Sequence, residues 1–245
     1  MVKEVSGSLR HMRREVAPPY WPILKKEYTW TVKPRPGPHP IRRAIPLGII
    51  VRDVLKYART MREARRILGE GHIKVDGRIR RDYKFPVGLM DVLEIVTTGE
   101  IYRLVPHPQK FLTLISIPKE EAGYKLCRVE GKTTVKGGLF QLHLHDGRNL
   151  LLNGEEASAY KTYDVVKLKI PEQEVVERVK FGEGTLAVVI DGRNVGKIGK
   201  IKSVMRIFKT ANALVTLESE EGEEVRTLLK YVFVVGTEKP LLKIR

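Results

Sequence analysis

The chain has 245 residues, a length that usually forms more than one small domain, and its 45 lysine and arginine residues against 29 acidic residues leave a formal net charge of +16. This charge, with a pI near 9.9, indicates a polyanionic partner. The single cysteine, Cys127, excludes an internal disulfide and a cysteine-based zinc site, and no apolar run approaches the roughly 20 residues that span a membrane. Because Arg10, Arg13 and Arg14 interrupt any apolar core of a signal peptide, we expect a cytoplasmic protein without a membrane partner.

The positive charge is concentrated at the two ends of the chain. Residues 1–45 carry 10 basic and 3 acidic side chains, and residues 178–245 carry 13 and 8. Residues 101–177 are nearly neutral, with 11 and 10. This distribution favours two regions that contact a polyanion and a spacer between them.

Residues 1–45 are rich in proline, which disfavours regular helices and central strands. We expect an extended basic tail with Trp21 and Trp30 exposed unless a partner covers them, and a folded core that does not depend on this tail. The basic residues of the tail that are candidates for contact with the polyanion are Arg35, His39, Arg42 and Arg43.

Residues 46–100 begin with two predicted helices. In the first, Leu47, Ile50, Val51, Val54, Leu55 and Ala58 recur at helical spacing, and Pro46 lies at the first turn. Thr60 and Glu63 have the spacing of a capping box, so a second helix should begin there and end at Gly69. The basic residues expected outside the buried stripe are Arg52, Lys56, Arg59, Arg62, Arg65 and Arg66.

A hairpin should follow these helices, because Asp76-Gly77 is a pair favoured in tight turns. Basic side chains surround it: Lys74, Arg78, Arg80 and Arg81. Guanidinium groups from the helix and the hairpin would thus share one surface suited to phosphates. The alternative is an exposed lattice of ion pairs with Asp53, Glu63 and Glu70, which stays open above all for Arg52, Lys56 and Arg59.

Residues 101–177 read as short strands with one helical turn at 119–122. A second Asp-Gly-Arg turn occurs at 146–148, and we interpret Arg148 as solvated. His143 and His145 alternate on a strand near Asp146, but two imidazoles without a clear third ligand are a weak signal for a metal. We expect no metal site.

Residues 178–245 contain the glycine-rich and basic run from Gly184 to Ile201, with a third Asp-Gly-Arg at 191–193. Tight turns in this run would bring its polar side chains toward a ligand. The candidates for contact with the polyanion are Arg193, Asn194, Lys197, Lys200 and Lys202.

Two of these segments resemble known RNA-binding motifs. Residues 45–95 resemble the helix–helix–hairpin motif of ribosomal proteins, pseudouridine synthases and some tRNA synthetases, and residues 184–201 resemble the KOW motif of small SH3-like barrels. With WTVKPRPGPHP at 30–40 and EAGYKLCRV at 121–129, the order of the motifs resembles the archaeal and eukaryotic ("e") family of small-subunit ribosomal protein four, most closely its archaeal members.

The resemblance implies an α+β fold that is mostly β. Its parts would be an extended basic tail (1–45), a helix–hairpin RNA-binding module (46–100), a central β domain (101–177) and a KOW SH3-like barrel with a short basic end (178–245). It also implies a non-catalytic constituent of the small ribosomal subunit, with ribosomal RNA and neighbouring ribosomal proteins as partners and no cofactor or small-molecule substrate.

Two other functions share single motifs with this chain. A pseudouridine synthase would need a large catalytic domain with an essential aspartate, and the roughly 80 residues between the two motifs show none. A transcription elongation factor would share the KOW segment but not the helix–hairpin module. The architectural role fits both motifs.

Overall fold

The computed structural model describes residues 10–205, 213–219 and 222–244, and these form mostly β structure with short helices. Three five-stranded antiparallel sheets make up most of the molecule, in the strand orders β5-β4-β7-β8-β9, β12-β11-β10-β13-β14 and β18-β17-β16-β15-β19. The prediction of a mostly β protein with few helices is confirmed. Within the described residues, no helix is long and apolar enough to cross a membrane.

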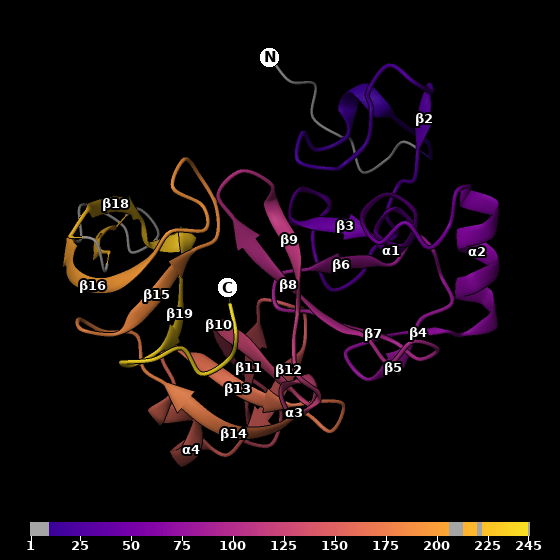
Figure 1. Cartoon of the computed structure of the whole chain (residues 1–245). Coiled ribbons are helices and arrows are strands. Elements are labelled where there is room, and N and C mark those ends of the chain that lie inside the picture. The colour runs from indigo at the N-terminus through magenta and orange to yellow at the C-terminus, as the bar shows by residue number, and fades with distance from the viewer. Residues whose placement is uncertain (1–9, 206–212, 220–221, 245) are drawn as a thin grey trace.

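The described part of the tail folds onto the rest of the chain instead of extending away from it (Figure 1). Its elements are β1 (Met12–Arg13), η1 (Arg14–Val16), β2 (Trp30–Thr31) and η2 (Ile41–Arg43), and β1 pairs with β2. Trp21 is 3% exposed, and its indole Nε1 donates a hydrogen bond of 2.9 Å to the carbonyl of Ala44. The prediction of an exposed Trp21 is therefore wrong, whereas Trp30 is indeed exposed.

The segment in which we predicted two helices lies at the right of the view in Figure 1, and the first of them is only a short helical turn followed by a π-helical turn. The elements here are β3 (Ala44–Pro46), α1 (Leu47–Ile49), the π-helical turn η3 (Ile50–Val54), α2 (Met61–Glu70) and β6 (Pro86–Gly88), which pairs with β3. Pro46 caps α1 instead of lying inside it, and Val54 and Leu55 are only partly buried. The side chain of Thr60 and that of Glu63 form the predicted capping box of α2.

The predicted end of α2 at Gly69 is wrong. The helix continues through Gly69 to Glu70, and Gly71 ends it with a left-handed φ of 88°. The N–H of Gly71 bonds the carbonyl of Leu68, as expected of a glycine cap.

The first large sheet contains β4 (Ile73–Val75), β5 (Arg78–Ile79), β7 (Val92–Ile95), β8 (Ile101–His107) and β9 (Phe111–Ser116). Asp76 and Gly77 both have positive φ, 51° and 74°, so the predicted tight hairpin between β4 and β5 is confirmed. The sheet runs past residue 100, where we expected the module to end, because β8 pairs with β7 and carries β9 with it.

The central sheet contains β10 (Tyr124–Thr134), β11 (Phe140–Leu144), β12 (Asn149–Leu152), β13 (Val165–Lys169) and β14 (Glu174–Val179). Two short helices flank it, α3 (Lys119–Ala122) and α4 (Gly154–Ala159). The sheet has its own small apolar core, which includes Cys127, Leu142 and Val166.

The third sheet contains β15 (Leu186–Val189), β16 (Ile198–Met205), β17 (Leu214–Glu218), β18 (Glu224–Leu228) and β19 (Val232–Gly236), with the turn η5 (Leu229–Tyr231) before the last strand. The third Asp-Gly-Arg lies in a loop between β15 and β16 that is longer than a tight hairpin turn. β19 packs against β10, β13 and β14, which joins this sheet to the central one.

Candidate nucleic-acid interface

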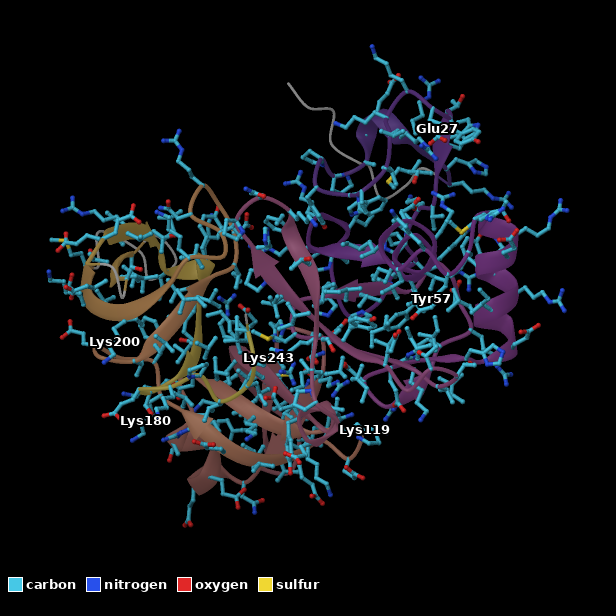
Figure 2. All side chains as sticks on the ribbon, viewed as in Figure 1. Glu27, Tyr57, Lys119, Lys180, Lys200 and Lys243 are labelled. Carbon is cyan, nitrogen blue, oxygen red and sulfur yellow. The ribbon has the colours of Figure 1, made fainter. Side chains whose placement is uncertain are left out.

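The outer face of α2 carries three exposed arginines, Arg62, Arg65 and Arg66, and nitrogen-tipped side chains project outward from this helix in Figure 2. The guanidinium of Arg65 lies 4.1 Å from the ring centroid of Tyr83 and donates a 2.9 Å bond to its hydroxyl. Arg66 pairs with Glu70 at 2.9 Å, and Arg62 has no partner among the described residues. The ring of Tyr83 thus orients one guanidinium, while the other two side chains stay in solvent.

The β4–β5 hairpin follows α2 in the chain and carries further basic residues, of which Arg78 and Arg80 line a hollow beside Arg148 and Pro171. Arg78 and Arg81 are exposed and have no ion-pair partner in the described ranges. Arg80 is half-buried, with its guanidinium 4.4 Å from the ring centroid of Phe85. Lys74 is half-buried and pairs with Glu94 at 3.3 Å. The hairpin therefore offers two solvated arginines and one arginine held against a ring.

In the segment before α2, only some of the basic residues form the ion pairs that the alternative interpretation expects. Arg52 donates two hydrogen bonds to the carboxylate of Asp53, from Nε at 3.0 Å and from Nη2 at 2.9 Å. Lys56 is exposed and has no ion-pair partner within the described residues. Glu63 accepts the backbone N–H of Arg59 and that of Thr60, and these bonds lower the pKa of its carboxyl below the usual value.

The four tail candidates differ in their surroundings. Arg35 and Arg42 are exposed, and Arg35 pairs with Asp82 at 3.0 Å. Arg43 donates from Nε and Nη2 to one oxygen of Asp191, at 3.2 and 2.8 Å, which ties the tail to the β15–β16 loop. His39 is only 6% exposed and its Nε2 lies 3.0 Å from Asp91, so it is absent from the surface that RNA can reach.

The five candidates of the third sheet also separate into two groups. Three of them already have partners. Asn194 donates to the carbonyl of Arg226 at 3.3 Å. Lys197 forms an ion pair with Glu223 at 2.8 Å, and Lys202 forms one with Glu224, in β18, at 2.6 Å. Arg193 and Lys200 are exposed, with no ion-pair partner in the part of the chain that the structure describes.

The structure also contains a buried charge cluster, which sequence reasoning missed. The ammonium of Lys125, 1% exposed, lies 2.7 Å from Asp76, 2.5 Å from Asp91 and 3.0 Å from Asp146. Burial disfavours its charge, but the three carboxylates together raise the pKa of Lys125 well above its usual value.

Arg148 completes this cluster, so its interpretation as a solvated side chain is wrong. Its Nη2 lies 2.7 Å from Asp76 and its Nε 3.3 Å from Asp146. Burial opposes ionisation of Asp91 and Asp146. Nevertheless, His39 and Lys125 hold the pKa of the Asp91 carboxyl below its usual range, and Lys125 and its neighbours do the same for Asp146.

Near this cluster, ligand atoms of Cys127, His145 and Asp146 lie within 4.8 Å of one another. The ring nitrogens of His145 are occupied, Nδ1 by the N–H of Arg128 at 3.2 Å and Nε2 by the carbonyl of Leu89 at 3.3 Å. Asp146 already forms an ion pair with Lys125, and burial lowers the pKa of His145 to about 3. These contacts fit a neutral structural histidine in an ion network better than a metal ligand.

Comparison with known proteins relates these parts to families. Residues 6–42 match the RS4NT (NUC023) domain, residues 50–93 the S4 domain and residues 98–175 the ribosomal family S4e. The chain is 53% identical over 243 residues to the small ribosomal subunit protein eS4 of Staphylothermus marinus, which covers 97% of this chain and 96% of that protein. The chain belongs to the S4e family of ribosomal proteins.

Other members of the S4e family agree. The small ribosomal subunit protein eS4 of Pyrobaculum aerophilum is 51% identical over 236 residues, covering 96% of this chain and 98% of that protein. The crystal structure of the 30S ribosomal protein S4e from Thermoplasma acidophilum has a TM-score of 0.67 and 35% identity, covering 80% of this chain and 96% of that one. The resemblance seen in the sequence is thus confirmed.

In this S4e-family chain the buried cluster joins all three matched segments. His39 comes from residues 6–42, Asp76 and Asp91 from the S4 domain at 50–93, and the remaining members, Lys125, Asp146 and Arg148, from residues 98–175. Two signals for it were present in the sequence, the lysine inside an apolar strand run and the repeated Asp-Gly-Arg. Neither signal says which distant turns meet.

Proposed function

We propose that this protein is a non-catalytic structural constituent of the small ribosomal subunit, which binds ribosomal RNA and supports subunit assembly and translation. The single observation that carries the proposal is the basic surface of α2 and the β4–β5 hairpin within the residues that match the S4 domain. The RNA surface consists of Arg62, Arg65, Arg66, Arg78, Arg80 and Arg81.

This surface suits the backbone of folded RNA. Double-helical RNA hides its base edges in a deep groove, so a protein reads its shape, its phosphates and its 2′-hydroxyls. Arginine presents a planar fork of donors that can bind two phosphate oxygens. Neutralising phosphates releases counterions and supplies affinity without any chemical step.

Other basic residues would contribute less to RNA binding, because several of them already form ion pairs with acidic residues. Lys56 and Arg59 lie just before α2, and Arg42 lies in the tail. Arg193 and Lys200 belong to the third sheet, on the other side of the molecule from α2 in Figure 2, and would form a second contact region. Arg35, Arg43, Arg52, Lys74, Lys197 and Lys202 would exchange an acidic partner for phosphate. Asn194 would contact RNA from the β15–β16 loop.

We assign the parts as follows. α1, η3, α2 and the β4–β5 hairpin form a helix–helix–hairpin motif, and the third sheet forms the KOW SH3-like barrel. The tail, the helix–hairpin module, the central β domain and the barrel would meet near residues 45, 100 and 177, with the first large sheet crossing the boundary near 100 to include β8 and β9. Neighbouring small-subunit proteins are the second class of partner, and the protein resides in the cytoplasm with the subunit.

Binding of the full chain to small-subunit ribosomal RNA across a range of salt concentrations tests the proposal. We expect log Kobs to fall linearly with log salt, by about 0.7–0.9 per phosphate contacted. Large-subunit ribosomal RNA is the control and should bind more weakly at the same salt. Equal affinity for both RNAs, or affinity that salt does not change, would contradict the proposal.

A further inference from the structure

A groove of about 990 Å³ separates the folded tail from the segment that leads into α2. One wall consists of Glu27 to Trp30, with Arg14 behind it, and the other of Arg52, Asp53, Lys56 and the run from Ala58 to Met61. In Figure 2 the label of Glu27 marks the tail wall. Thr60 and Met61 line the groove and begin α2, so it is continuous with the RNA surface.

The tail wall presents two exposed aromatic rings. Tyr28 is 63% exposed and Trp30 is 56% exposed. Both residues are oriented by neighbours. The guanidinium of Arg14 lies 4.9 Å from the ring centroid of Tyr28, and His11 packs at a tilt against Trp30 with ring centroids 5.7 Å apart. Large aromatic side chains lose apolar hydration when covered, so two ordered, exposed rings in one groove indicate a partner with flat apolar faces.

The electrostatics of the groove favour an anionic partner. Glu27 neutralises the buried Arg14 at 3.1 Å, and Asp53 neutralises Arg52. The remaining cations that line the groove are Lys56 and Arg59. Lys56 holds its ammonium in solvent and has a left-handed φ of 59°, which is uncommon for a residue with a side chain.

We infer that this groove binds one unpaired nucleotide of ribosomal RNA. The base stacks on Trp30, in the groove that Tyr28 also lines, and the flanking phosphates lie against Lys56 and Arg59. A base inside a double helix has both faces covered by its neighbours, so only an extruded or single-stranded base can use these rings. The inference rests on the proposed function and adds to it a specific preference for an unpaired position beside the helical surface.

The test uses the full chain and two RNA duplexes of the same sequence, one of which carries a single bulged adenosine. We expect wild-type protein to prefer the bulged duplex by about tenfold, within the range of one stacked base. Trp30→Ala should abolish this preference without changing affinity for the plain duplex. Leu24→Ala, which removes an exposed apolar side chain of the tail outside the groove, should retain it. Trp30→Phe retains an aromatic face and should retain most of it.

Trp30 also serves as a fluorescent reporter, because the chain has only two tryptophans and Trp21 is buried. The bulged duplex should quench emission in wild-type protein but not in Trp30→Phe. An unchanged preference in Trp30→Ala, or none in wild type, overturns the inference. The inference is also overturned if Trp30→Ala loses binding to small-subunit proteins but keeps the preference for the bulged duplex. If wild-type protein fails to bind small-subunit ribosomal RNA itself, the proposed function fails instead.

Discussion

At the residue scale, Lys125 is the side chain on which three carboxylates depend. Lys125→Met leaves Asp76, Asp91 and Asp146 buried without their shared cation, and breaking a buried ion pair by removing one partner costs about 3–5 kcal/mol of unfolding free energy. Urea denaturation measures the loss. Lys136→Met, at an exposed position, should change stability by less than about 0.5 kcal/mol. Equal stabilities of the two variants would contradict the structural role of the cluster.

The same neighbourhood predicts a dependence of stability on pH. Burial lowers the pKa of His145 to about 3 in the folded state, against about 6.5 in an unfolded chain. Between these values only the unfolded chain binds this proton, so the unfolding free energy should fall as the pH is lowered from 6.5 toward 3. The lowered pKa values of Asp91 and Asp146 add a further loss below about pH 4. Stability of His145→Gln should depend less on pH between 6.5 and 4; an unchanged slope would refute the assignment.

Arg65 and Arg66 carry the prediction for RNA binding. Arg65→Glu with Arg66→Glu should reduce the slope of log Kobs against log salt by about two, because two phosphate contacts are lost. Both side chains are exposed, and the pair of Arg66 with Glu70 contributes little, so thermal stability should change only slightly. The control Lys119→Glu with Lys136→Glu makes the same change in charge on other exposed residues. If both double variants lose affinity equally, the charge of the protein, and not this surface, determines binding.

At the element scale, two glycines near the end of α2 should respond in opposite directions. Gly71 has left-handed φ, so Gly71→Ala should cost about 1 kcal/mol or more. Gly69 is helical and exposed, and an added methyl group meets nothing within 4 Å, so Gly69→Ala should stabilise by up to about 1 kcal/mol. Denaturant titration of both variants distinguishes the observed helix end from an end at Gly69, for which the signs would be reversed.

At the scale of the whole molecule, the described tail is part of the folded core and not an appendage. We expect Trp21→Ala to cost about 3–5 kcal/mol, because it removes a buried ring and leaves a cavity. Trp30→Ala, at an exposed site, should change stability by less than about 0.5 kcal/mol. Calorimetry of both variants tests this difference. Similar stabilities would restore the expectation of a core that does not depend on the tail.

The sequence predicted what local patterns determine. The capping box at Thr60, the tight turn at Asp76-Gly77 and the mostly β character all follow from residues close together in the chain. It failed where distant segments meet, since the burial of Trp21 and the pairing of Arg148 with Asp76 depend on tertiary packing. Helical spacing alone brings the arginines of α2 to one exposed face, whereas the burial of His39 depends on Asp91, 52 positions away.

The most direct test of the central claim is sedimentation of the tagged protein in native cell extract at rising salt, with sequencing of cross-linked RNA and mapping of the cross-linked peptides. We predict migration with the small subunit in stoichiometric amount, with cross-links to its ribosomal RNA on the peptides that contain α2 and the β4–β5 hairpin. Migration outside ribosomes, with transfer RNA or RNA polymerase, or the absence of cross-links from those peptides, would contradict the account.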